Sequence, residues 1–326
     1  MQVVVLAGGV GGSRFVAGVR QAYPQARLTV IVNTADDITL HGLRICPDLD
    51  TMTYTLGGGI DPDRGWGRAG ETWRVKDELA AYGVEPTWFG LGDLDLATHL
   101  ARTQLLAAGL PLSDVTRRVT ARWLRHDPLL TLLPMTDDTV ETEVAIADPE
   151  APGGRQWLHF QEYWVRLRAA PDALGLRRTG IESTHPAPGV AEAVAAADLV
   201  LVAPSNPVVS IGPILEVPGI RAALVATTAP VIGFAGILGG APVLGMAHRL
   251  LPAIGVAVDA AAVGRHYGAR PDGVLDLWVM DPADADSAAG LERDGLRVAV
   301  TGLMMSSPEA TAEFIRLAVK ALPRSL

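Results

Sequence analysis

A glycine-rich segment near the amino terminus has the composition of a phosphate-binding turn. Residues 8–13 read Gly-Gly-Val-Gly-Gly-Ser and follow the apolar run of residues 3–6. Glycines let backbone amides approach a ligand closely, and a helix that starts here offers unpaired N–H groups that suit phosphate. No Gly-Lys-Ser/Thr follows, which excludes a P-loop, and Arg14 stands where a dinucleotide-binding fingerprint needs its third glycine. The alternative interpretation is a tight turn without a ligand.

Polar side chains follow the second apolar run, residues 28–32. Asn33, Asp36 and Asp37 lie just past its end. In open α/β sheets ligands bind at the carboxyl ends of the strands, so these side chains are candidates to bind a polar ligand or a metal ion. The alternative is an Asx turn that caps a helix.

A second acidic stretch comes soon after. Asp48 and Asp50 are two residues apart, so an extended segment would place both on one face. Asp61 and Asp63 follow a run of three glycines. Mg²⁺ prefers oxygen ligands and usually takes one or two carboxylates together with substrate phosphates. The pattern predicts a magnesium site, and the alternative is that Asp50 caps a helix over residues 51–56.

A late apolar run, residues 199–203, also ends in polar residues. Ser205 and Asn206 stand between two prolines, with Ser210 a few residues beyond. Prolines stiffen the loop, so it presents an amide and hydroxyls rigidly, as a phosphate or a base edge requires. The alternative is a plain connection into a helix near Pro213.

An aromatic stretch in the first half of the chain is a candidate slot for a planar ligand. It combines Trp88 and Phe89 with two glycines and Asp93. Packing in the core is the alternative role for the two aromatic side chains.

The elements that carry these segments predict an α/β fold with a mostly parallel, Rossmann-like sheet. The first apolar run, a helix over residues 13–22 and the second apolar run form a right-handed βαβ unit. Further strands are expected at 198–204 and 229–234, because continuous apolar runs are typical of strands covered on both faces. A last helix is expected at 308–321, with Ser307 as its N-cap.

The middle of the chain follows a different pattern. Residues 71–120 have mainly helical periodicity, whereas 142–146 and 156–160 are typical of antiparallel strands joined by a Pro-Gly-Gly turn. We therefore expect a single Rossmann-like domain over residues 1–326, with an inserted helical and hairpin subdomain at approximately 67–180.

The composition is that of a compact globular protein, with 49% apolar and 19% charged residues. The formal net charge of -9 argues against binding to nucleic acid, which needs a positive face. Cys46 is the only cysteine, so no disulfide can form within the chain, and a reducing, cytoplasmic compartment is expected. No apolar run reaches the roughly 20 residues that span a bilayer, so we expect no membrane association.

Taken together, these segments resemble the 2-phospho-L-lactate transferase family of coenzyme F-420 biosynthesis, in particular its actinobacterial members. The resemblance extends over nearly the whole chain. It is carried by the glycine turn, the acidic segments up to Trp66 and the late polar loop. Residues 88–99, 159–162 and 263–270 match as well.

The resemblance implies an enzyme that transfers a phospholactyl or phosphoenolpyruvyl group. The donor would carry this group on GMP through a diphosphate, and the acceptor would be the deazaflavin Fo (7,8-didemethyl-8-hydroxy-5-deazariboflavin). GMP would be released, Mg²⁺ would be required and the enzyme would be a homodimer. Such a transfer needs charge neutralised on the phosphate oxygens and a hydroxyl held in line, which Mg²⁺ assists.

The resemblance also implies roles for individual residues. Asp50 and Asp61 match the metal site, and Asp50 is the candidate catalytic residue that accepts the hydroxyl proton. The expected nucleotide contacts are Gly8, Gly9, Gly11, Gly12, Ser205, Asn206 and Ser210. The expected acceptor contacts are Asn33, Asp36, Asp37, Trp88 and Asp93.

Two other functions stay open at this point. A non-catalytic, nucleotide-sugar-binding regulator of the same superfamily would share the fold and the glycine turn, but it matches the segments at Asp50 and Asp61 less well. Formation of GMP from donor and Fo by the purified protein distinguishes the two. Arg14 disfavours a nicotinamide-dependent dehydrogenase, and the absence of NAD binding in a titration would exclude it.

Overall fold

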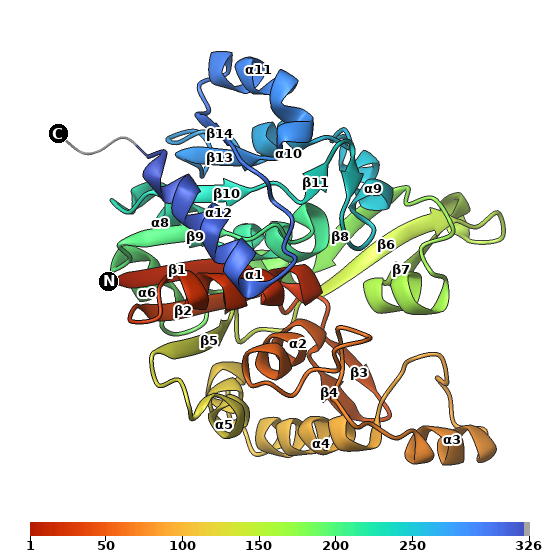
Figure 1. Ribbon diagram of the computed structural model, residues 1–326. Helices are drawn as coiled ribbons and strands as arrows, with labels where there is room; N and C mark the ends of the chain where they lie inside the picture. Colours follow the sequence, from red (N-terminus) through yellow and green to blue (C-terminus); the bar gives the residue numbers. More distant parts are fainter. Residues whose placement is uncertain (323–326) are drawn as a thin grey trace.

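Seven parallel strands form the central sheet of the computed structural model, which describes residues 1–322 (Figure 1). The order across the sheet is β14-β13-β10-β9-β1-β2-β5, and every neighbouring pair runs parallel. The strands are β1 (Gln2–Ala7), β2 (Arg27–Val32), β5 (Leu130–Pro134), β9 (Leu199–Val202), β10 (Val231–Phe234), β13 (Leu277–Met280) and β14 (Val298–Val300). Apart from Gln2, every residue of β9, β1, β10 and β13 is buried, as expected for strands covered on both faces.

The direction in which strands are added reverses between β1 and β9. From β1 the chain moves through β2 to the edge strand β5, then returns to β9 and continues through β10 and β13 to β14. In sheets of this kind ligands bind at the carboxyl ends of the strands where the order reverses. The glycine turn follows β1 and the Ser205 loop follows β9, so both lie at this point. The predicted Rossmann-like α/β fold is confirmed.

Helix α1 (Gly9–Ala22) packs against α12 (Pro308–Lys320), and Figure 1 shows the two in front of the sheet. Gly18 permits this approach, because a Cβ atom there would lie 2.2 Å from Thr311 Cγ2. Ser307 caps α12 as predicted, since its Oγ accepts a hydrogen bond from Ala310 N at 3.2 Å. The other helices of this half are α6 (Val190–Ala195), α7 (Gly212–Glu216), α8 (Ile220–Ala226), α9 (Ala247–Leu250), α10 (Ala260–Tyr267) and α11 (Ala288–Arg293).

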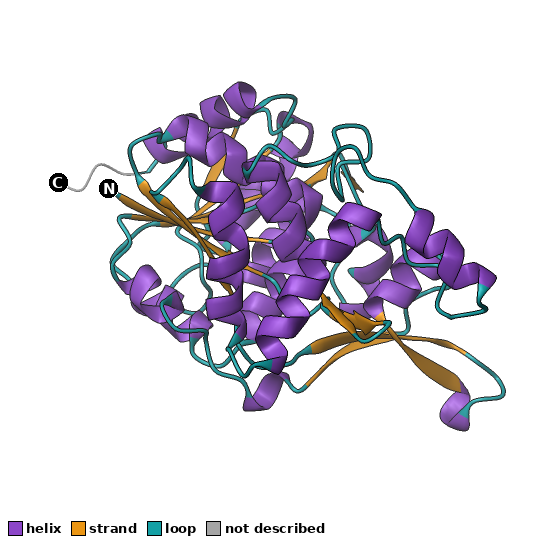
Figure 2. Cartoon of the chain, turned by 90° about the horizontal axis from the view of Figure 1, so that it is seen from below, coloured by secondary structure: helices purple, strands orange, loops and turns teal. Residues whose placement is uncertain are grey.

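Further elements stand outside the central sheet. Between β2 and β5 lie the hairpin β3 (Ile38–Leu40) and β4 (Leu43–Ile45) and the helices α2 (Pro47–Leu56), α3 (Arg74–Ala81), α4 (Asp93–Ala107) and α5 (Leu112–Leu124). After β5 comes an antiparallel sheet of β6 (Glu141–Ala147), β7 (Arg155–His159) and β8 (Gly175–Thr179), which Figure 2 shows reaching away from the central sheet. The insertion expected at 67–180 is therefore divided by β5, a strand of the central sheet.

Short elements complete the chain. A small hairpin is formed by β11 (Ile237–Leu238) and β12 (Ala241–Pro242). The short helical turns are η1 (Pro152–Gly154), η2 (Glu162–Arg166), η3 (Ile181–Ser183), η4 (Pro207–Ile211), η5 (Pro252–Ile254) and η6 (Pro282–Ser287). The predicted pairing of the two strands around the Pro-Gly-Gly turn is confirmed, because β6 and β7 are antiparallel on either side of η1. Strand β8, which pairs with the other edge of β6, was not predicted.

Two helices begin earlier than the sequence predicted. Helix α1 begins at Gly9 rather than at residue 13, so the glycine turn is the first turn of the helix. Helix α2 begins at Pro47, and its N-cap residue is Cys46. The extended segment expected around Asp48 and Asp50 is therefore wrong, and Asp50 caps no helix. Proline at the first helical position and acidic side chains in the first turn both favour a helix that starts here.

Within residues 1–322, no single helix is long and apolar enough to cross a membrane. One bent pair passes on length and composition, formed by Pro207–Glu216 and Ile220–Ala226 at an angle of 81°.

Candidate active site

The glycine turn and the late polar loop meet at the point where the strand order reverses. Ser205 Oγ donates a hydrogen bond to Gly8 O at 2.8 Å and accepts one from Gly8 N at 3.2 Å. Ser210 lies against the same glycine, because a Cβ atom on Gly8 would be 2.9 Å from Ser210 Cβ. Ser205 and Ser210 are both buried. Two segments nearly 200 residues apart thus form one wall around the start of α1.

Three of the four glycines of the turn are required by the structure, whereas Gly11 is not. Gly9 alone among the four has a positive φ, of 66°. A Cβ atom on Gly8 would lie 2.4 Å from Asp48 Oδ2, and one on Gly12 would lie 2.6 Å from Ser205 Oγ, so both positions lack room for a side chain. Gly11 has an ordinary φ, and its nearest neighbour would be Pro204 O at 3.7 Å. Gly11 therefore has neither a backbone conformation nor a close contact that requires glycine.

The amides at the start of α1 form the phosphate-type feature of the site. Gly8 is the N-cap residue, its position carries no capping side chain, and the first turn contains no acidic residue. The helix is 14 residues long and starts directly after β1. The positive end of its dipole therefore lies at the reversal point of the sheet. Asn206 serves its own loop instead, because its Oδ1 accepts hydrogen bonds from Val208 N at 2.9 Å and Val209 N at 3.3 Å.

A pocket opens beside the Ser205 loop, at the carboxyl ends of β9 and β10. Its walls include the 204–207 segment and the aromatic side chains of Phe234, Tyr267 and Trp278. The sequence interpretation did not select these three side chains. Phe234 is the last residue of a predicted strand, a position from which side chains reach ligands in parallel sheets, so a signal for it was present.

The aspartates that follow β2 join Asp48 in one buried acidic cluster. Asn33 Nδ2 donates to Asp48 Oδ2 at 2.9 Å, and Asn33 Oδ1 accepts from Ala35 N at 3.1 Å. The clash that a Cβ atom on Gly8 would have with Asp48 puts this carboxylate directly beside the glycine turn. Asn33, Asp36, Asp37 and Asp48 are all less than 9% exposed.

Burial controls the ionisation of this cluster. Burial raises the pKa of Asp36 well above its ordinary value, the negative charges of Asp48 and Asp37 raise it further, and the Arg178 charge opposes them. Burial also raises the pKa of Asp48 to about 6, although hydrogen bonds from Asn33 and the Gly9 amide oppose the shift. Burial raises the pKa of Asp37 to about 7, against the opposing charge of Arg44.

Several carboxylate oxygens of the cluster lack a hydrogen-bond partner among residues 1–322. They are Asp36 Oδ1 and both oxygens of Asp37. Among residues 1–322, the only cation paired with Asp37 is Arg44, whose Nη2 lies 3.7 Å from Asp37 Oδ2. Buried carboxylates with unsatisfied oxygens are costly unless a proton or a cation joins them, so the cluster is a candidate to take up either.

Asp50 has a different environment. It lies in α2, and both of its oxygens accept hydrogen bonds from the buried guanidinium of Arg102 in α4, one of them at 3.0 Å. His99 Nδ1 lies 3.7 Å from Asp50 Oδ2, and His99 Nε2 lies 3.4 Å from Asp95 Oδ2. Oxygens of Asp50 and Asp95 and a His99 nitrogen lie within 4.8 Å of one another, but the adjacent Arg102 already neutralises Asp50. The pair therefore fixes α2 against α4.

This arrangement predicts a large loss of stability for Asp50→Asn. Arg102 is 3% exposed, and breaking a buried ion pair by neutralising one partner costs about 3–5 kcal/mol. The double variant Asp50→Asn/Arg102→Met should recover much of that loss, because no uncompensated charge remains. Urea unfolding of both variants measures the effect. A single variant with the wild-type free energy of unfolding would contradict a structural role for the pair.

Asp61, the second expected metal ligand, lies in the loop after α2 and has partners within that loop. Its Oδ1 accepts from Asp63 N at 3.0 Å and from Arg64 N at 2.9 Å, and Arg64 Nη2 lies 2.8 Å from its Oδ2. Asp50 and Asp61 therefore have separate, already satisfied environments.

The aromatic stretch lies beside the β3–β4 hairpin. Trp88 and Phe89 are half-buried and pack against a small apolar cluster of Ile38, Leu40 and Ile45. Because β3 begins directly after Asp37, this stretch borders the acidic cluster along the chain. Asp93 is engaged in packing α4 against α3, since its carboxylate accepts from Thr72 Oγ1 at 2.6 Å and from Val75 N at 3.1 Å.

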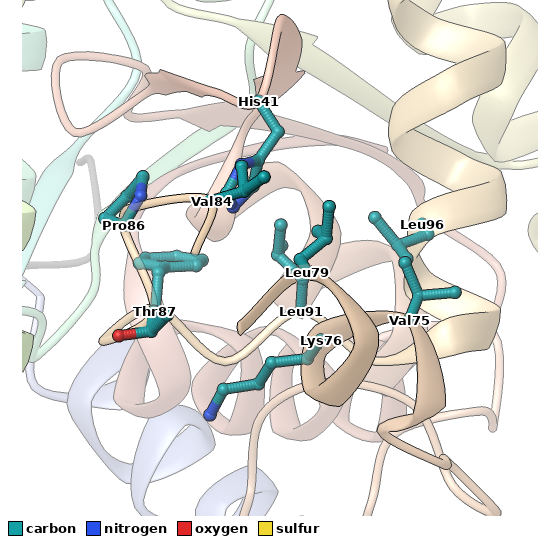
Figure 3. Close-up of a pocket in the computed structure, with 10 residues that line it drawn as sticks. His41, Val75, Lys76, Leu79, Val84, Pro86, Thr87, Leu91 and Leu96 are labelled. Carbon is teal, nitrogen blue, oxygen red and sulfur yellow. The ribbon is translucent and has the colours of Figure 1, made fainter. Parts of the chain in front are cut away.

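A small apolar pocket lies between this stretch and α3, and Phe89 is part of its lining. Figure 3 shows His41 from the β3–β4 turn above Leu79 of α3, with Leu91 below Leu79 and Leu96 to the right. Its lining includes neither Trp88 nor Asp93. It is separate from the pocket beside the Ser205 loop.

Comparison with known proteins identifies the family of this chain. The sequence profile of the family described as 2-phospho-L-lactate transferase CofD matches residues 3–300. The chain is 54% identical over 320 residues to a phosphoenolpyruvate transferase of Streptomyces griseus, covering 98% of each chain. It is also 54% identical over 319 residues to a phosphoenolpyruvate transferase of Nocardia farcinica, covering 98% of this chain and 94% of the relative. A crystal structure of a UPF0052 family protein from Bacillus halodurans has the same fold, with a TM-score of 0.62, 16% identity, and coverage of 96% of this chain and 98% of that one.

A Rossmann-like parallel sheet with a glycine turn, a polar loop and buried carboxylates at its reversal point defines an α/β protein with a candidate ligand site at its strand ends. The chain belongs to the 2-phospho-L-lactate transferase family of coenzyme F-420 biosynthesis, and it is a transferase.

Proposed function

We propose that this enzyme transfers a phosphoenolpyruvyl or phospholactyl group from a GMP-linked diphosphate donor to the deazaflavin Fo. The ribityl hydroxyl of Fo gives up its proton to solvent as its oxygen attacks the substituted phosphorus. The bond from that phosphorus to the bridging oxygen breaks, and GMP leaves with that oxygen. One observation carries the proposal: a phosphate-type turn and a buried acidic cluster lie at adjacent strand ends, in contact through Gly8 and Asp48. The names of the relatives at 54% identity support the transferred group.

The donor would bind along the reversal point of the sheet. Its phosphates would accept hydrogen bonds from the first-turn amides of α1 that follow Gly9, because Gly8 N already donates to Ser205 Oγ and the Gly9 amide to Asp48. The helix dipole favours negative charge there.

The guanine ring of the donor would occupy the pocket beside the Ser205 loop, against Phe234 and Tyr267. The phosphates and the guanine ring would then bind to two segments that are fixed to each other. Ser205 Oγ fixes them by hydrogen bonds to both the N–H and the carbonyl of Gly8.

Mg²⁺ would fit the acidic cluster better than the pair expected from the sequence. Asp36 and Asp48 are buried, repel one another and include an unpartnered oxygen, whereas both oxygens of Asp50 bind Arg102. We therefore propose Asp36 and Asp48 as ligands in place of Asp50 and Asp61. Bound there, Mg²⁺ would neutralise charge on the donor phosphates. Asp50 would act indirectly, by fixing the helix that carries Asp48.

The acceptor would lie on the side of the β3–β4 hairpin. Its flat ring would pack against Trp88, which borders the apolar cluster that follows Asp37 in the chain. Its ribityl hydroxyl would point toward the loop of residues 33–37. Asp93 would shape the edge of this slot by holding α3 on α4. A homodimer in the cytoplasm is the assembly and location that we propose from the family.

Incubation of the purified enzyme with Fo, Mg²⁺ and each candidate donor tests the function directly. Mass spectrometry of the products should find a deazaflavin phosphodiester and one equivalent of GMP, with the preferred donor giving the faster formation. A sample with Mg²⁺ removed by chelation serves as the control and should form little product. Binding of donor without any phosphodiester or GMP would instead indicate a non-catalytic regulator.

A further inference from the structure

Two adjacent arginines on β8 point to opposite faces of the antiparallel sheet. Arg177 is exposed, where it pairs with Glu143 at 2.8 Å and stacks on Trp157. Arg178 faces inward, with 9% of its side chain exposed. Side chains alternate along a strand, so the neighbouring residues have unrelated environments. Directly opposite Arg178 in the β6–β8 pairing stands Thr142.

Arg178 binds to the turn that carries Ser210, η4. Its Nη2 donates a hydrogen bond to Val208 O, and its Nη1 lies 2.9 Å from Glu216 Oε1 at the end of α7. Gly212 makes room for the guanidinium, because a Cβ atom there would lie 3.1 Å from Arg178 Nη2. One side chain thus joins both ends of the segment from η4 to α7.

The same sheet also holds the loop after β2. Thr142 N donates to Ala35 O at 2.7 Å. Gln161, which follows β7, donates from Nε2 to Asp36 O at 3.4 Å. The cross-strand pair of Thr142 and Arg178 therefore connects residues 33–37 on one side with residues 207–212 on the other, and both segments border the reversal point of the central sheet.

We propose that Arg178 is a positioning residue that sets the separation between the loop of residues 33–37 and the turn of residues 207–212. This interpretation of the two segments rests on the proposed function. In that function, their separation places the acceptor hydroxyl in line with the donor phosphorus. Arg178 is not among the proposed contacts of either ligand, so we expect GDP and Fo to bind without it. Its charge also acts on Asp36, a proposed Mg²⁺ ligand, so kcat is measured at saturating Mg²⁺. The transfer step does require Arg178, because a misplacement of about 1 Å can cost roughly 100-fold in rate.

Arg178→Met, Arg178→Lys and the matched control Arg177→Met test the inference. Arg178→Met should lower kcat by roughly 100-fold, while the Kd of GDP by calorimetry and that of Fo by its fluorescence change less than about threefold. Arg178→Lys keeps the charge but cannot reach both Val208 O and Glu216 in the same way, so it should restore part of kcat. Arg177→Met should retain wild-type kcat.

A second readout does not depend on activity. Hydrogen exchange of the free protein should accelerate in both segments, 33–37 and 207–212, in Arg178→Met and in neither segment in Arg177→Met. If Arg178→Met does not fold, Arg178→Lys and Glu216→Gln should display the same paired change in weaker form. Faster exchange in one segment only, or a loss of kcat matched by an equal loss of GDP affinity, would overturn the inference. A wild-type enzyme that forms no product refutes the proposed function and leaves the exchange result to decide on the linkage.

Discussion

Asp48→Asn is expected to lower kcat of the transfer by roughly 100- to 1,000-fold, the range for removal of one preorganised electrostatic group. The substitution is nearly isosteric, and its side-chain oxygen can still accept the hydrogen bond from Asn33 Nδ2. It removes the buried carboxylate beside the glycine turn and hence a proposed Mg²⁺ ligand. Steady-state kinetics with Fo as acceptor measures the loss.

Asp61→Asn is the comparison that decides between the two proposed metal sites. The carboxylate of Asp61 accepts hydrogen bonds from its own loop, so the Asp61→Asn variant should retain near-wild-type kcat. If Asp61→Asn is inactive while Asp48→Asn turns over normally, the site lies where the sequence interpretation put it, with Asp50 and Asp61.

Stability against pH checks that Asp48→Asn acts on chemistry and not on folding. Burial raises the pKa of Asp48 from 3.8 to about 6, so its protonated form is favoured by folding. The contribution of Asp48 to the stability of the wild-type protein therefore falls as the pH rises from about 4 through about 6. The amide introduced by the substitution does not titrate, so the variant should unfold at higher urea than wild type at pH 8 and at a similar concentration below pH 4. A destabilised variant at pH 8 would assign the kinetic loss to folding.

Gly8→Ala is expected to weaken GDP binding by roughly 100-fold, the equivalent of two charge-assisted hydrogen bonds of about 1.4 kcal/mol each. The φ of Gly8 is -156°, so the backbone itself tolerates alanine. The obstacle is space, because the new Cβ would lie 2.4 Å from Asp48 Oδ2 and 2.9 Å from Ser210 Cβ. The turn and its two neighbours would have to separate, which moves the helix amides away from the phosphates.

Gly11→Ala is the matched control for this prediction. It lies in the same turn, has an ordinary φ, and leaves 3.7 Å between its Cβ and Pro204 O. Calorimetry should find its GDP affinity close to that of wild type. Equal and unchanged affinities for both variants would mean that the turn serves the fold and that the nucleotide binds elsewhere.

The parts of the site that the sequence predicted are those that depend on local signals. The apolar run of residues 3–6, the glycines after it and the run of residues 28–32 form a βαβ unit whatever the rest of the chain does, since their order along the chain defines it. Ser205 follows a similar run, and polar residues at parallel strand ends converge on one edge of a sheet. The resemblance to the family added the transferred group and the acceptor.

Local sequence signals thus specify the class of sheet, the phosphate-type turn and the set of acidic segments near it. The environment of each acid depends on long-range contacts. Asp48 and Asp50 are equivalent in the sequence, yet Arg102, 52 residues beyond Asp50, neutralises one and leaves the other beside Gly8. The role of Arg178 was equally hidden, because its partners lie on elements that the sequence did not pair. The physical reason is the same in both cases: the charge of a buried group depends on neighbours that long-range folding brings to it, and no local pattern specifies them.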